Sequence, residues 1–183
     1  MPSRGFTLLE SVVIVAISAT MLIVLVDLYR AHSGLYNYQK ATADTAGSAS
    51  VTANELQEWV LQANRILTST TISGTTYTTD SDTLVLEVPS IDGSGNAITS
   101  TYDFVVFYIN GTKLSRILSP NAASSRTSST KTLSVNLSSL SLTYNTASAA
   151  AATQIIADIR TDSTEGRMDA QYQLTQKLYL RNQ

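Results

Sequence analysis

The first feature of the chain is a long apolar run close to its N-terminus, covering residues 6–26. The run contains no proline, glycine or lysine, and Glu10 is its only charged residue. A helix rises about 1.5 Å per residue, so this segment would extend about 30 Å, the thickness of the hydrocarbon core of a bilayer. The pattern predicts a transmembrane helix over residues 6–26.

Three alternatives fit this run less well. A secretory signal peptide has an apolar region of about 7–15 residues followed by a small-residue cleavage site, whereas this run is longer and lacks such a site at residues 24–27. A core helix of a globular domain conflicts with a segment that is apolar on all sides. A plain membrane anchor fits the length but has no use for the carboxylate of Glu10. The alternative for Glu10 is that it lies near enough to the helix end to reach the interface.

Beyond residue 26 the chain becomes polar without a helix breaker, and apolar or small residues recur every three or four positions. These positions are Leu35, Tyr38, Thr42, Ala46, Ala49, Ala53, Leu56, Val60, Ala63 and Leu67. The spacing predicts an amphipathic continuation of the helix over residues 27–68, ending near Leu67. Its middle part has small side chains and contains Gly47, so we expect a looser contact or a bend there. We expect Trp59 to pack in the core.

Residues 69–183 change to a period of two, which predicts a β-rich head. The expected strands cover residues 83–88 (closed by Pro89), 102–109, 113–118, 133–137, 140–144, 155–159 and 168–180. The dipeptide Asn110-Gly111 predicts a hairpin turn, and the Ser138-Ser139 interruption indicates a bend or a bulge. The fold class expected is α+β: a long N-terminal helix packed on an antiparallel sheet.

Composition narrows the classes of function. Charged residues make up 14% of the chain, below the roughly 25% of a typical soluble domain, and the formal net charge is −2, so no electrostatic footprint for nucleic acid is present. The chain has no cysteine and a single histidine, His32. No set of nucleophile, base and orienting residue stands out, nor a phosphate loop or a metal cluster. We therefore expect a protein that is not an enzyme and uses no cofactor or metal.

Two loops carry acidic or amide side chains whose oxygens are calcium ligands in other proteins. Asp80 and Asp82 lie in one, and Asp92 and Asn96 in the other, but neither has the acidic pattern of a twelve-residue EF-hand loop. We favour turn formation for these residues. The sequence indicates no role for the loop at residues 119–126.

The residues at the start of the apolar run resemble a known processing motif. A short leader, residues 1–5, contains Arg4 and ends in Gly5, and Phe-Thr-Leu-Leu-Glu follows from Phe6 to Glu10. This combination resembles the N-terminus of type IV pilins and type II secretion pseudopilins. The resemblance implies cleavage by a prepilin peptidase between Gly5 and Phe6 and N-methylation of Phe6. It also implies a role in filament assembly for Glu10, whose carboxylate would attract the N-terminal amine of a neighbouring subunit.

The same resemblance implies a pilin-like fold and a structural subunit of a type IV pilus or a type II secretion-like pseudopilus. The subunit would be a single-pass protein of the cytoplasmic (inner) membrane with an extracytoplasmic head before assembly. Its partners would be other subunits, the prepilin peptidase, the inner-membrane assembly platform and membrane lipid, with no specific nucleic acid. Asp27 stands where many major pilins carry a kinking proline, and no cysteine pair is present, which favours a minor pilin or a J-like pseudopilin. The alternative is a monomeric, membrane-anchored surface binding or adhesion domain.

Overall fold

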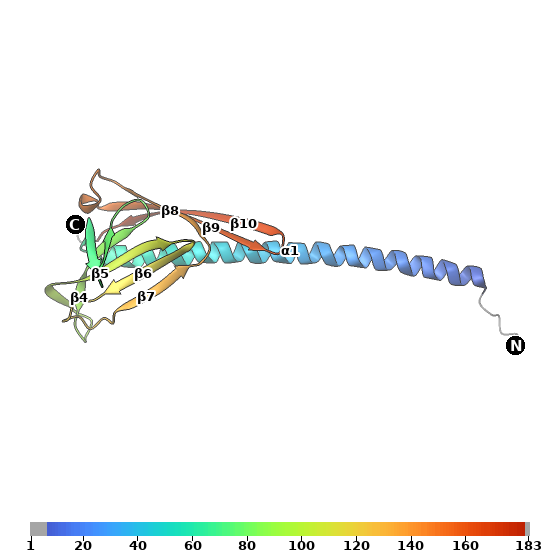
Figure 1. Cartoon of the computed structure of the whole chain (residues 1–183), viewed down its shortest axis with the longest axis horizontal. Helices are drawn as coiled ribbons and strands as arrows, with labels where there is room; N and C mark the ends of the chain where they lie inside the picture. The colour runs from blue at the N-terminus through green and yellow to red at the C-terminus, as the bar shows by residue number, and fades with distance from the viewer. Residues whose placement is uncertain (1–6, 182–183) are drawn as a thin grey trace.

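One long helix followed by antiparallel strands makes up the computed structural model, which describes residues 7–181 (Figure 1). The helix α1, Leu8–Gln62, runs unbroken for 55 residues. Its N-terminal half projects alone, and the strands gather around its C-terminal half (Figure 1). The predicted α+β layout, with an apolar N-terminal helix ahead of a β-rich head, is confirmed at this level.

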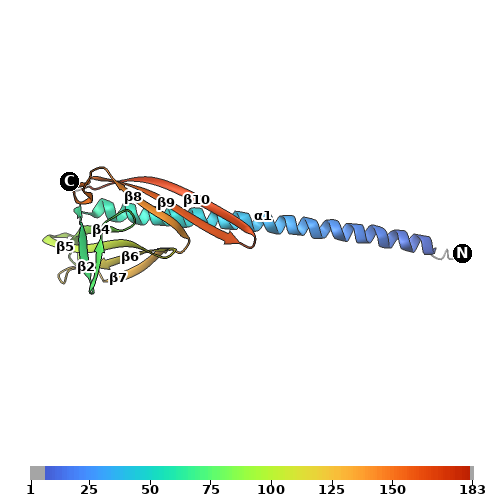
Figure 2. The same cartoon turned by 45° about the horizontal axis from the view of Figure 1, so that its top comes forward.

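The strands form two main sheets and one separate hairpin, all antiparallel. Their bounds are β1 Arg65–Ile66, β2 Ser69–Ile72, β3 Thr75–Thr78, β4 Leu84–Ile91, β5 Ala97–Asn110, β6 Lys113–Ser119, β7 Ser129–Ser134, β8 Leu137–Tyr144, β9 Gln154–Glu165 and β10 Met168–Tyr179, with a short 3-10 helix η1 at Ala149–Ala151. The five-stranded sheet has the order β1-β4-β5-β6-β7 and the three-stranded sheet the order β10-β9-β8. The two sheets lie on different sides of α1 (Figure 2), whereas the sequence indicated a single sheet.

The end of α1 differs from the prediction. The helix stops at Gln62 rather than near Leu67, because Asn64 donates its backbone N–H to the carbonyl of Glu87 at 2.8 Å. This bond leads into the pairing of β1 with β4, in which Arg65 lies opposite Glu87. Strand pairing with a distant segment therefore replaces the last predicted helical turn.

Most predicted strands are present with shifted bounds. The Asn110-Gly111 turn is confirmed: Asn110 pairs with Lys113, and Gly111 has a φ of 63°. Strand β4 continues through Pro89, where its pairing with β5 becomes irregular. Between β7 and β8 the chain crosses from one sheet to the other at residues 135–136, and a register shift between Leu137 and Ser139 marks the predicted irregularity.

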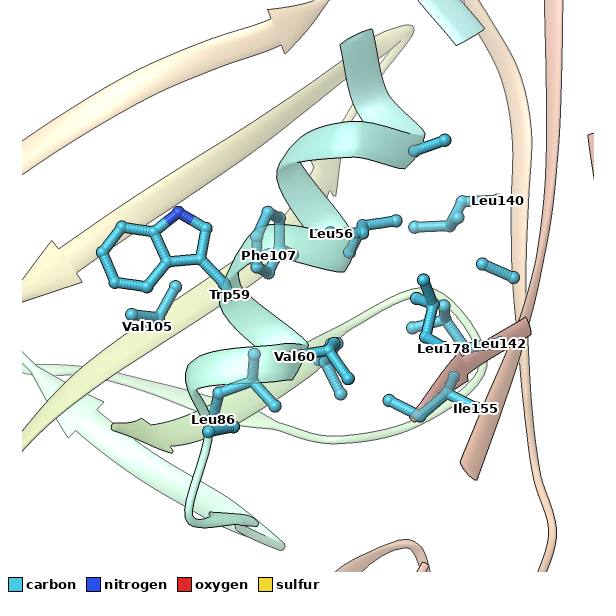
Figure 3. Close-up of a cluster of buried hydrophobic side chains, with 14 of the residues drawn as sticks. Leu56, Trp59, Val60, Leu86, Val105, Phe107, Leu140, Leu142, Ile155 and Leu178 are labelled. Carbon is cyan, nitrogen blue, oxygen red and sulfur yellow. The ribbon is translucent and has the colours of Figure 1, made fainter. Parts of the chain in front are cut away.

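A single core connects the two sheets through the C-terminal half of α1. Figure 3 shows Trp59 and Val105 on one side of the helix ribbon and Ile155 and Leu178 on the other. The buried cluster draws on α1, on the five-stranded sheet and on the three-stranded sheet. Neither sheet encloses a core of its own, so burial of apolar surface joins helix and sheets into one unit.

The small residues in the middle of α1 pack closely rather than loosely. Ala41, Thr45 and Ala49 are fully buried, and α1 contacts both β9 and β10. The hydroxyl of Thr161 on β9 donates to the carbonyl of Thr45 at 2.9 Å. The expectation of a looser contact was wrong, because short side chains let the strands approach the helix backbone.

Candidate functional site

The exposed half of α1 is the most unusual surface of the molecule. Every residue from Leu8 to His32 is exposed, including large apolar side chains such as Leu9, Ile17 and Leu25. This stretch is about 37 Å long at 1.5 Å per residue. Within residues 7–181, α1 is the one helix that is long and apolar enough to span a membrane. The structure thus provides a segment of the right length and composition for a membrane span, none of it covered by the head.

Glu10 takes part in a reciprocal cap at the start of α1. Its Oε2 accepts the backbone N–H of Thr7 at 2.9 Å and the Thr7 hydroxyl at 3.1 Å. The backbone N–H of Glu10 in turn donates to Thr7 Oγ1 at 3.3 Å. This arrangement is a capping box, which satisfies backbone donors that the first helical turn leaves without partners. Within residues 7–181, both hydrogen bonds that the carboxylate of Glu10 accepts go to Oε2 and none goes to Oε1.

A local sequence signal for this cap exists, although the cap was not among the predictions. A threonine three residues ahead of a glutamate, just before an apolar run, is the pattern of a capping box. Gly5 and Phe6, the predicted cleavage and methylation residues, lie outside the described residues, so both assignments stay predictions. Of the predicted site residues, Glu10 alone is described, and it lies in the exposed apolar stretch.

The β9–β10 hairpin tip marks the boundary between the exposed and covered parts of α1. Lys40 Nζ lies 2.6 Å from Glu165 Oε1, and the hydrogen bond and negative charge of Glu165 raise the pKa of Lys40. Gly166 turns the hairpin with a φ of 65°, and a Cβ at this position would lie 3.0 Å from Asn37 Nδ2. The head therefore touches α1 through a turn in which a side chain at Gly166 would be strained by the positive φ and would press on the side chain of Asn37.

A buried carboxylate holds the loop for which the sequence indicated no role. Asp103 is fully buried and accepts hydrogen bonds from the Ser90 hydroxyl (2.6 Å), the Asn121 backbone N–H (2.9 Å), the Ser124 hydroxyl (2.9 Å) and Arg126 Nη1 (2.7 Å). Burial opposes ionisation of Asp103, but these hydrogen bonds outweigh it and hold its pKa below the ordinary value. Both carboxylate oxygens of Asp103 accept hydrogen bonds from this chain, and the cluster therefore holds the loop at residues 119–126 against β4 and β5.

Trp59 lies in the core, as predicted, and two guanidinium groups contact its ring. It is 7% exposed, and the guanidinium carbons of Arg116 and Arg126 lie 5.0 and 5.6 Å from the ring centroid. Arg116 also pairs with Glu55 at 3.0 Å, and Lys131 contacts the same carboxylate. These contacts tie α1 to β6, β7 and the loop before β7 by cation–π and charge-assisted bonds.

The two acidic loops form turns. Asp80 Oδ1 accepts the backbone N–H groups of Asp82 and Thr83 at 3.0 and 2.8 Å. Asp92 Oδ1 accepts the backbone N–H of Asn96 at 2.9 Å. The turn interpretation is confirmed for both loops. Among the residues that the structure describes, no three His, Cys, Asp or Glu side chains are grouped so as to hold a metal ion.

The fold and the site together define a class of protein: an α+β chain whose helix is buried in a head at one end and exposed and apolar at the other. In comparisons with known proteins, no family model, no curated protein and no solved structure matches this chain. The functional assignment therefore rests on the residues and the geometry described above.

Proposed function

We propose that this chain is a minor structural subunit of a type IV pilus or of a type II secretion-like pseudopilus, with a pilin-like fold. The observation that carries the proposal is the division of α1. Residues 8–32 are exposed and largely apolar, with Glu10 near their start, and the same unbroken helix continues into the core of the head. A filament subunit needs both halves, one to pack with other subunits and one to hold its own head.

The exposed half needs an apolar surrounding. Contiguous apolar surface of this extent marks a membrane or protein interaction site. Lipid surrounds it before assembly, and the helices of neighbouring subunits surround it in the filament. Both surroundings are apolar, so transfer between them costs little hydrophobic free energy, and close packing of small residues such as Ala16 and Ser18 favours the helix bundle.

Glu10 supplies the polar contact of that bundle. Cleavage between Gly5 and Phe6 would create a methylated amine on Phe6, and an unpaired ammonium group among apolar helices is costly. A carboxylate from a neighbouring subunit neutralises it, provided that the carboxylate has a free oxygen. Oε1 of Glu10 meets this condition, because both bonds from Thr7 go to Oε2.

The minor-subunit assignment is supported by the course of α1 around Asp27. Asp27 lies within α1, and its Oδ1 atom is 3.7 Å from Nη1 of Arg30. The helix is unbroken at this position, where many major pilins have a proline. The role is structural rather than catalytic. The proposed partners are other pilin or pseudopilin subunits, the prepilin peptidase and the inner-membrane assembly platform.

The test is to express the full chain with and without a prepilin peptidase and to measure the intact mass and the filament content. We expect a peptidase-dependent change to a chain that starts at N-methylated Phe6, and we expect this form in sheared filaments. A chain that keeps Met1 in both conditions and stays as a monomer in the membrane would instead support the surface-anchored binding domain.

A further inference from the structure

An open cavity lies where the head meets the exposed half of α1. It has a volume of about 330 Å³. Tyr29, Arg30 and Asn37 of α1 form one wall, and Arg167 and Met168 at the tip of the β9–β10 hairpin form the other. We propose that this cavity binds the phosphate of a phospholipid headgroup, which fixes the head against the membrane surface before assembly. The inference rests on the membrane placement of α1 in the proposed function.

The charges at the cavity favour an anion. Arg167 makes no ion pair within residues 7–181, and Arg30 has only a long contact of 3.7 Å to Asp27, both arginines being exposed. Of the acidic groups at the hairpin tip, Glu165 is paired with Lys40, whereas Asp169 accepts a hydrogen bond from the Thr164 hydroxyl and has no ion pair in the described part of the chain. Arginines from two different elements thus line one opening, and the planar fork of an arginine matches the oxygens of a phosphate.

The position of the cavity along α1 selects the lipid as the source of that phosphate. If the hydrocarbon span ends at Val26, Arg30 lies about 6 Å further along the helix axis. The headgroup layer on each side of a bilayer is about 5–7 Å thick, so Tyr29 and Arg30 lie within it. Tyrosine is enriched at this depth because its ring is apolar and its hydroxyl polar. Arg167 lies between Gly166 and Met168, which contact α1 at Asn37 and Gly34, about 6–10 Å further along the helix axis than Arg30. Its long side chain therefore has to extend toward the membrane to share one headgroup with Arg30.

Contacts with α1 hold the tip of the β9–β10 hairpin next to the cavity. The Lys40–Glu165 contact and the tight approach of Gly166 to Asn37 fix the tip on α1 next to the cavity. A Cβ on Gly34 would lie 3.2 Å from Met168 Cε, so the backbone of α1 is also close to the tip. These contacts hold the hairpin tip against α1, so that binding of one headgroup has to order only the two arginine side chains.

The experiment uses the purified full-length chain in dodecyl maltoside micelles, a detergent without phosphate. Phosphatidylglycerol is titrated in, and native mass spectrometry measures the fraction of chains that retain a lipid. The variant Arg30→Gln/Arg167→Gln is compared with Arg181→Gln, which removes an exposed arginine beside Leu61 and Gln62 at the C-terminal end of α1. Figure 1 shows that this end of α1 lies within the head, remote from the exposed half of the helix. Arg30→Lys/Arg167→Lys keeps the charge without the fork.

We expect the half-saturating lipid concentration to rise at least about fivefold in the double glutamine variant, to rise less in the lysine variant, and to stay unchanged in Arg181→Gln. Equal lipid retention by the wild type and the double glutamine variant would overturn the proposal. Displacement of the lipid by millimolar inorganic phosphate would overturn the lipid assignment in favour of a free-phosphate site. The measurement needs neither cleavage nor a filament, so its failure leaves the proposed assembly function standing, and failed assembly leaves the lipid result standing.

Discussion

The carboxylate of Glu10 accepts the backbone N–H of Thr7 at 2.9 Å, and Thr7 Oγ1 accepts the backbone N–H of Glu10 at 3.3 Å. Glu10 therefore caps the start of its own helix, and under the proposed function it also pairs with a neighbouring subunit. The two roles differ in what they require. The cap needs an acceptor of the right length, which glutamine also provides, whereas neutralising an amine needs a negative charge.

Glu10→Gln separates these roles. If the charge of Glu10 pairs with an amine in the filament, this variant will insert into the membrane normally but enter filaments about tenfold less or worse, because an unpaired buried charge costs several kcal/mol. Glu10→Ala should be equally defective. The readout is the amount of subunit in sheared filaments relative to membranes. Thr7→Val, which removes only the hydroxyl of the cap, is the matched control and should assemble. Normal assembly of Glu10→Gln would show that the charge of Glu10 is not needed in the filament.

A pair of glycine substitutions tests the hairpin tip. Gly166→Ala should lower the free energy of unfolding by about 1–2 kcal/mol, because a φ of 65° is unfavourable for alanine and its Cβ would crowd Asn37. Gly47→Ala should raise it by about 0.5–1 kcal/mol, because Gly47 lies within α1 with no atom within 4 Å of an added Cβ. Urea denaturation of the full chain in micelles measures both. Shifts of the same sign in the two variants would contradict the assigned geometry.

The buried cluster around Asp103 makes a large contribution to stability. Asp103→Asn should cost about 2–4 kcal/mol, below the full penalty of a completely buried pair, because it leaves the partly buried guanidinium of Arg126 without its counter-charge. Asp44→Asn is the control: Asp44 is exposed on α1, and its replacement should change stability by less than about 0.5 kcal/mol. Thermal unfolding followed by circular dichroism distinguishes the two. If Asp103→Asn lowers the stability no more than Asp44→Asn does, the Asp103 cluster does not stabilise the fold.

The same carboxylate gives the protein an acid-sensitive step. The pKa of Asp103 is lowered in the folded chain, so its stabilising effect is complete above the ordinary value of 3.8 and is lost as the pH falls through the lower folded value. The pKa values of Asp80 and Asp92 are lowered as well and add to the effect. We expect the Tm of the wild type to decrease as the pH is lowered below about 4. The Tm of Asp103→Asn should decrease less over the same pH range. If the Tm of both proteins decreases equally with pH, the acid sensitivity comes from other carboxylates.

Local sequence patterns predicted which helices and strands are present. They predicted less well where these elements end and how the strands are arranged in sheets. The Asn110-Gly111 turn and the apolar run of α1 depend on neighbouring residues, and both are present. The helix end near Gln62 depends on pairing with Glu87, which no local pattern reveals. The β2–β3 hairpin was missed although Ser73-Gly74, with φ values of 50° and 86°, is a turn dipeptide between β-forming residues.

The contacts that fasten the head were harder to foresee, since they join residues far apart in the chain. Asp103 and Arg126 are separated by 23 positions and meet only after β5 and the loop before β7 are in place. A weak signal existed, because Asp103 is the only charged residue in β5. The capping box of Glu10 could have been predicted from the sequence, because Thr7 lies three positions before Glu10.

The unbroken course of α1 has a mechanical consequence. Between Leu8 and Gln62 no proline interrupts the backbone hydrogen bonds, and the last part of the helix is locked between two sheets. Tension or torque applied to the head would therefore pass along a stiff rod to the apolar end without a hinge to absorb it. A rotation of the head about the helix axis would therefore be transmitted to the exposed apolar end.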